Sequence, residues 1–266
     1  MLVPSMNAVI ASLAAAPIYG LSALLAWHRP RWATALVPLA LALHFAALAL
    51  GLVHQGSLRI GVTEAASLFA WQSAVLLWLF ALREPIAVNG TAIYPLAAVF
   101  AVWAALVPSP ISQVRVSDWQ VTVHVLLSLL SAGLLTLAAV QSVALAIQDR
   151  LLHRHRVPPT GARLPPLQTM ERVLFQLIAV GFALLSLTLL TGLWFVHDWM
   201  AQHLAHKTVL SVSAWMIFGV LLWGRWRYGW RGRTAIRWAL AGYATLVVAY
   251  FGSKAILEQI FGNHWS

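Results

Sequence analysis

The sequence predicts an all-α fold, a polytopic membrane bundle of eight transmembrane helices with both termini outside. Hydrophobic residues make up 61% of the 266 residues, charged residues only 9%, and the mean hydropathy is +0.80. A soluble domain carries charge on roughly a quarter of its residues, so an ordinary soluble enzyme is excluded. No polar block is large enough for a second domain. We therefore expect one integral membrane domain over residues 1–266.

Eight apolar segments are each long enough to cross a bilayer, which takes about 20 mostly apolar residues in a helix. They span residues 6–27, 32–53, 63–82, 91–107, 119–147, 172–196, 208–224 and 235–257. Several contain Gly or Pro, which membrane helices tolerate because neighbouring helices satisfy the freed backbone groups.

The first segment has no basic residue before it, since Arg29 and Arg31 follow the apolar run. We therefore expect a retained helix and not a cleaved signal peptide. The second segment carries His44 near its middle, and Glu64 lies at the start of the third. The fifth opens on Trp119, and many other Trp residues also lie near segment ends, as in an aromatic belt.

Lys and Arg residues are concentrated in alternate connections. Thirteen of the 17 lie on one side, and the others are Arg59, Arg115, Lys207 and Lys254. The rich side is cytoplasmic by the positive-inside rule, which places both termini outside. Residues 148–170 are the longest connection and contain four Pro residues and a basic run at 150–156. We expect them to form a cytoplasmic linker, so the high net charge of +10 needs no nucleic-acid partner.

Two histidines inside the apolar segments are functional candidates. An ionisable group inside the bilayer is costly, so His44 is either functional or a neutral imidazole bonded to a neighbouring helix. His124 lies one to two turns into the fifth segment, just below the outer surface and near Trp119. It is an outward-facing ligand or a buried polar side chain at a capped helix start.

The outer connection between the sixth and seventh segments holds the densest set of coordinating side chains. These are His197, Asp198, His203 and His206. Three imidazoles and a carboxylate could bind zinc, copper or nickel, although their spacing matches no established zinc motif. An outward-facing polar loop would have the same composition. The chain has no Cys, which excludes disulfides, thiolate metal sites and covalent c-type haem attachment.

His124 and His264 both lie at the outer boundary in this topology, and they come within reach if the fifth and eighth segments pack together. Two neutral imidazoles from separate helices are a common way for a bundle to hold haem iron. His44 lies deeper, and could ligate a second haem or lie on a path to the first. The seven acidic residues lie mostly at segment ends and form no catalytic pair or triad, so hydrolytic catalysis has little support.

Four stretches in this order resemble the cytochrome c assembly family of the CcsA type, and especially its compact YpjD-like branch. His44 resembles the family's transmembrane His, and residues 61–71 are similar to its Asn-x-Tyr-Glu-Ser element, with Glu64 at the acidic position. The Trp119 to His124 run is similar to the stretch bearing the first outer haem ligand. Residues 250–264, from Tyr-Phe-Gly to His264, resemble the stretch that ends in the second.

Two motifs of the family are missing. Its Trp-x-Trp-Asp-Pro-Lys-Glu loop corresponds here to residues 202–208, which keep only Lys207, and its second membrane His is replaced around residues 223–225. Without the Trp platform, the likeness favours binding or assistance over direct haem delivery to apocytochrome.

The resemblance implies a multi-pass protein of the bacterial inner membrane that binds b-type haem non-covalently. Its cofactor-binding residues would be His124, His264, His44, Glu64 and Trp119. It would assist cytochrome c or respiratory-complex assembly without chemistry of its own, with the lipid bilayer, apocytochrome or other assembly proteins as partners. The alternatives are a transition-metal permease or its regulatory partner, using the outer His cluster, and a scaffold in which every His is merely hydrogen-bonded.

Overall fold

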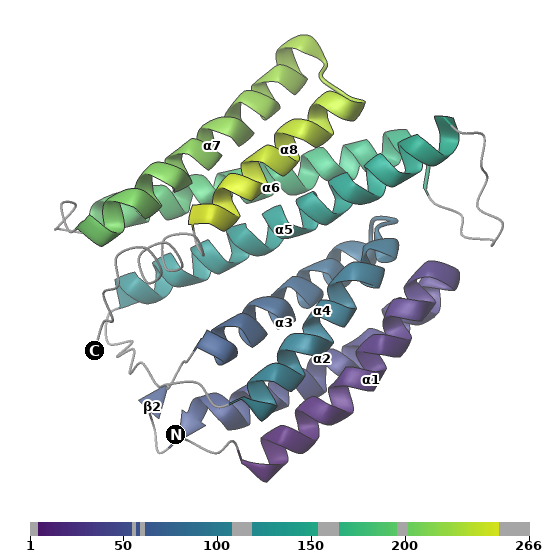
Figure 1. The fold of residues 1–266 in the computed structure, drawn as a ribbon, viewed down its shortest axis with the longest axis vertical. Coiled ribbons are helices and arrows are strands. Elements are labelled where there is room, and N and C mark those ends of the chain that lie inside the picture. The colour runs from purple at the N-terminus through teal and green to yellow at the C-terminus, as the bar shows by residue number, and fades with distance from the viewer. Residues whose placement is uncertain are drawn as a thin grey trace. The chain divides into compact units, whose positions relative to one another are not determined.

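The structure is a computed structural model that describes residues 5–54, 57–58, 62–107, 119–153, 165–195 and 202–249. Its elements in chain order are α1 (Met6–His28), α2 (Pro30–Leu52), β1 (Val53–His54), β2 (Ser57–Leu58), α3 (Val62–Ala81), the 3-10 helix η1 (Ala87–Asn89), α4 (Gly90–Leu106), α5 (Trp119–His153), α6 (Leu167–Phe195), α7 (Gln202–Tyr228) and α8 (Gly232–Val247) (Figure 1). The strands β1 and β2 form one short antiparallel pair that the apolar pattern did not predict.

Seven helices of the described residues, α1 to α7, are long and apolar enough to cross a membrane. This confirms the all-helical membrane fold. The eighth expected segment begins as α8, which has 16 residues in the structure, and the rest of its expected range lies outside the described residues. Eight crossings with both termini outside therefore remain a prediction.

The chain divides into two compact units. Unit 1 comprises residues 1–119 and 151–173, and unit 2 comprises residues 120–150 and 174–266. In unit 1, α1 packs against α2 and α4, and α3 packs against the same two helices. Buried alanines along α1, such as Ala15, Ala23 and Ala26, let the neighbouring helices approach closely. Van der Waals packing of this kind holds helices together where lipid supplies no hydrophobic driving force.

Proline residues interrupt three helices of unit 1, at Pro17, Pro38 and Pro95. A proline in a helix cannot donate to the carbonyl four residues earlier. For Pro38 that carbonyl belongs to Thr34, and the indole Nε1 of Trp78 in α3 donates to it at 3.0 Å. The Trp78 side chain thus replaces the missing helical hydrogen bond and also joins α3 to α2.

Small residues and hydroxyl groups bring α5, α6 and α8 of unit 2 together. Ser131 of α5 donates to the carbonyl of Gly181 in α6 at 3.0 Å. A Cβ on Gly181 would lie 2.8 Å from Leu135, so the glycine sets the close approach of α5 and α6. Further along α5, the hydroxyls of Thr136 and Tyr243 are 3.1 Å apart, which places α8 against α5.

Aromatic side chains fix α7 in the same unit. The indole Nε1 of Trp215 donates to the Ser186 hydroxyl of α6 at 2.8 Å, and its ring stacks on Phe182 at 5.5 Å. The Phe218 ring fills the space beside Gly242 of α8, where a Cβ would lie 2.9 Å from it. Unit 2 is thus a bundle in which every helix has a defined partner.

Helices α5 and α6 extend beyond the apolar runs that predicted them. We expected residues 148–170 to form a linker, but α5 continues to His153 and α6 begins at Leu167. Polar contacts stabilise these charged turns, since Arg233 lies 3.4 Å from Asp149, and Arg172 lies 3.0 Å from Glu84. Apolarity marks the lipid-embedded part of a helix, whereas its backbone hydrogen bonds continue into the polar turns.

Candidate functional site

His124 lies in the second turn of α5, and its imidazole is half-buried against α6. Its Nδ1 is 3.0 Å from the hydroxyl oxygen of Thr191. The location near the start of α5 is the one that the sequence predicts. The structure adds α6 as the element that orients the ring.

The hydrogen bonds of Thr191 favour one tautomer of His124. The Thr191 hydroxyl lies 2.9 Å from the carbonyl of Leu187 and 3.0 Å from that of Thr188, and carbonyl oxygens can only accept. When the hydroxyl donates its single proton to one of these carbonyls, its oxygen accepts from the imidazole Nδ1–H of His124. In the neutral ring, this leaves the lone pair on Nε2, which is the arrangement a metal-ligating histidine needs.

Gly192 provides the room for this ring. A Cβ at residue 192 would lie 3.2 Å from Cε1 of His124, which is tighter than an ordinary contact. Sequence reasoning missed both Thr191 and Gly192. The only signal was a Thr-Gly pair within an apolar run, and nothing in the chain linked that pair to a histidine 67 residues earlier.

Trp119 is the first residue of α5, and 71% of its side chain is exposed. On a helix, residues five apart point in different directions, so Trp119 and His124 do not share a face. Trp194, one turn beyond Thr191 on α6, is also exposed, at 82%. Exposed indoles on both helices are typical of a membrane interface.

His264 lies outside the described residues, but α8 approaches the end of α5 that carries His124. Helix α8 runs antiparallel to α5 (Figure 1) and contacts it through Tyr243 and Thr136. Along α5, about 18 Å separate Thr136 from His124. The 21 residues from Tyr243 to His264 would span about 31 Å even if fully helical, so the chain is long enough to reach. The described part of α8 thus contacts α5, and the approach of His264 to His124 remains a prediction.

His44 lies in α2 of unit 1 and is completely buried. Its Nε2 is 2.8 Å from the Ser67 hydroxyl of α3, and its Nδ1 is 3.3 Å from the Tyr19 hydroxyl of α1. These are the contacts of a neutral imidazole bonded to neighbouring helices. Iron could bind Nε2 only in place of Ser67.

The polar centre of unit 1 extends to its fourth helix. The ring of Tyr19 stacks on that of Tyr94 in α4, with centroids 6.2 Å apart. Glu64 lies in the first turn of α3, where a carboxylate is favoured by the helix dipole, and it accepts a hydrogen bond of 3.1 Å from Thr63. His44 and Glu64 therefore belong to unit 1, and His124 belongs to unit 2.

Two of the four residues of the outer His cluster fall outside the described residues. His197 and Asp198 lie there, while His203 and His206 lie in the first turns of α7, which starts at Gln202. Three positions apart on this helix, the two residues lie on the same face of its backbone. Among the described residues, no group of three His, Cys, Asp or Glu side chains could hold a metal ion.

The fold and the site together define a helical membrane protein with an oriented imidazole at the start of a long helix. The chain belongs to the Cytochrome C assembly protein family, whose model matches residues 31–261. This confirms the expected family.

Curated relatives agree with this assignment. The chain is 39% identical over 138 residues to Inner membrane protein YpjD of Escherichia coli (strain K12), which covers 52% of each chain. It is 34% identical over 165 residues to an uncharacterized 28.8 kDa protein of Azospirillum brasilense, covering 61% of each. The Cytochrome c biogenesis protein CcsA of Nostoc punctiforme is 24% identical over 110 residues, which cover 41% of this chain and 31% of that protein.

The chain thus spans about half the length of the first of these relatives. No solved structure gives a significant match. The apolar helices and the Escherichia coli relative bear out the expected localisation, a multi-pass protein of the bacterial inner membrane.

Proposed function

We propose that this protein binds haem in the membrane and assists the assembly of cytochrome c or of a respiratory complex, without hydrolytic chemistry. The observation that carries the proposal is the orientation of His124. Thr191 favours the Nδ1–H tautomer, Gly192 leaves room for the ring, and in this tautomer the Nε2 lone pair is available for a metal. Family membership supports the assembly role.

The ligand pair in this proposal is His124 and His264. Helix α8 contacts α5 through Tyr243. The 21 residues from Tyr243 to His264 are enough for His264 to reach the level of His124. Attachment would be non-covalent and b-type, because the chain has no Cys for thioether bonds. When bound, the haem would supply an iron centre, while these residues hold and orient it. Trp119 would contribute an aromatic surface at the same end of α5.

His44 and Glu64 remain predicted haem-contacting residues in unit 1. A ligand role for His44 would require its Nε2 to exchange Ser67 for iron. The lipid bilayer is the immediate environment of the apolar helices. Apocytochrome or other assembly proteins are the partners that the proposed role implies.

Replacing His124 tests the proposal directly. Wild-type protein purified from haem-replete cells should show a Soret band, and His124→Ala should lose or shift it, because removing one axial imidazole changes or empties the site. His264→Ala should have the same effect if it is the second ligand.

His153→Ala is the matched control, since His153 is an exposed residue at the far end of the same helix. It should leave the spectrum unchanged. Wild-type protein without haem, or His124→Ala with an unaltered spectrum, would overturn the proposal. Submicromolar zinc binding that is lost in the double variant His203→Ala, His206→Ala would favour the metal-permease alternative instead.

A further inference from the structure

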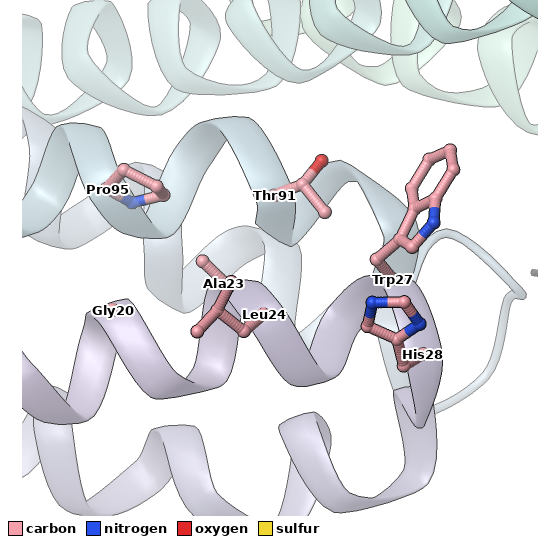
Figure 2. Close-up of a pocket in the computed structure, with 7 residues that line it drawn as sticks. All are labelled: Gly20, Ala23, Leu24, Trp27, His28, Thr91 and Pro95. Atoms are coloured by element: carbon pink, nitrogen blue, oxygen red, sulfur yellow. The ribbon is translucent and has the colours of Figure 1, made fainter. Parts of the chain in front are cut away.

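A groove lies between α1 and α4 of unit 1, with a volume of about 370 Å³ (Figure 2). Its lining residues are Gly20, Ala23, Leu24, Trp27, His28, Thr91 and Pro95. The residues from α1 follow the i, i+3, i+4, i+7 and i+8 spacing, which is one face of a helix. The groove therefore runs lengthwise along α1.

The two ends of the groove differ in polarity. Gly20 and Pro95 lie at one end and Trp27 and His28 at the other (Figure 2). A Cβ on Gly20 would meet nothing within 4 Å, so this end is open and apolar. The Thr91 hydroxyl donates to the Val88 carbonyl of its own turn at 2.8 Å, so the polar atoms at this end of the groove are those of Trp27 and His28. An occupant must therefore be apolar along most of its length and polar at one end.

Cationic side chains follow directly after the polar end. Helix α1 ends at His28, and Arg29 and Arg31 come next, both exposed. Within the described part of the chain neither arginine forms an ion pair. Glu84, the acidic residue of the neighbouring α3–α4 connection, is already paired with Arg172. The charge at this end of the groove thus complements an anion.

The dimensions match one leaflet of a bilayer. From Gly20 to His28, α1 rises about 12 Å, against about 15 Å for half the hydrocarbon core. Leu21 and Leu24 on this side of α1 are 50% and 68% exposed, as expected of a lipid-facing surface. Trp27 and the arginines mark the headgroup level, where indoles and basic side chains gather.

We propose that this groove binds one anionic phospholipid, with an acyl chain along Gly20, Ala23 and Leu24 and its phosphate at His28, Arg29 and Arg31. The acyl chain fills the apolar length of the groove. The basic side chains select the negative headgroup, because each Lys or Arg near an anionic lipid strengthens binding by about fivefold. The site is independent of the haem proposal and lies in the other unit from His124.

Native mass spectrometry of the purified full chain tests the site, with phosphatidylglycerol and phosphatidylcholine of identical acyl chains as probes. The wild type should retain one phosphatidylglycerol molecule preferentially. Arg29→Gln should reduce the preference for phosphatidylglycerol about fivefold. Arg150→Gln, which removes an exposed arginine from unit 2, should not change it.

Gly20→Leu should fill the groove and weaken binding of both lipids, without lowering the thermal stability. Gly51→Leu is the matched control, because a Cβ there also meets nothing within 4 Å and the residue is outside the groove. Equal retention of both lipids by the wild type would overturn the proposal. So would equal effects of the two leucine variants, or a co-purified isoprenoid quinone that Gly20→Leu removes in place of lipid.

Discussion

At the scale of single residues, the candidate site depends on a hydroxyl and a glycine as much as on a histidine. His124 stood out in the sequence because a polar group near the membrane boundary is costly to bury. Thr191 and Gly192 did not, because Thr and Gly are ordinary residues of membrane helices. Their importance comes from the register between α5 and α6, which depends on side-chain packing along the whole interface.

Thr191→Val should lower haem affinity about tenfold to hundredfold, the usual loss when the partner that orients a metal-bound histidine is removed. Valine keeps the shape of threonine but cannot accept from Nδ1–H of His124. A haem titration followed by absorbance measures the change. Thr188→Val, one turn earlier on α6, removes a hydroxyl that bonds, within the described part of the chain, to Leu184 of its own helix. This control should bind haem as the wild type does.

For His44, the sequence left two interpretations open, and the structure supplies its hydrogen-bond partners. Its place in the middle of an apolar segment allowed two readings, a ligand or a neutral imidazole bonded to other helices. The structure gives it hydrogen-bond partners on two neighbouring helices, Tyr19 and Ser67. Neither partner could be identified from the sequence, because the contact requires the crossing geometry of α1, α2 and α3.

At the scale of helices, apolar runs located the elements but not their ends or their mutual contacts. Long apolar segments predicted α1 to α7 because backbone groups must be satisfied within the membrane. The polar turns at the end of α5 and the start of α6 were not predicted, because they are not apolar. The presence of Pro38 in α2 was visible in the sequence, whereas its compensation by Trp78 was not, since the two residues are 40 positions apart.

Trp78→Phe should lower the free energy of unfolding by about 1–3 kcal/mol, because the Thr34 carbonyl loses its donor. Pro38→Ala restores a backbone N–H for this carbonyl, so the cost of Trp78→Phe should shrink in that background. Unfolding in mixed micelles measures both values as a double-mutant cycle.

Trp71→Phe is the control for this cycle. Its indole donates at 2.9 Å to the carbonyl of Leu41, which lies four residues before Phe45 inside α2 and so has its own helical donor. The effect of Trp71→Phe should be independent of Pro38. If Pro38→Ala reduced the cost of Trp71→Phe as much as that of Trp78→Phe, the Trp78 indole would not be replacing the hydrogen bond that Pro38 cannot donate.

At the scale of the whole molecule, composition alone predicted a membrane protein, and charge asymmetry predicted its orientation. The division into two units was not foreseen, because nothing in the composition changes where one unit passes into the other. A compact unit is defined by which helices touch, and apolar periodicity does not contain that information.

The orientation can be measured with reporter fusions. A fusion after Trp265 should report a location outside the cytoplasm, and one after residue 158 should report the cytoplasm, because thirteen basic residues lie on that side. A cytoplasmic reporter after Trp265 would overturn this topology, because the number of crossings would then be odd or the bundle inverted, and inversion would detach His124 from the outer boundary.

Each unit is built from two separate stretches of chain, so the polypeptide passes from one unit to the other three times, after residues 119, 150 and 173. A gene divided after residue 158 would therefore not yield one unit per fragment. The first fragment would carry α5 with His124, and the second would carry α6 with Thr191 and Gly192. Either fragment made alone should lack the Soret band, whereas co-expression of both should restore it, as a complementation assay in membranes can show.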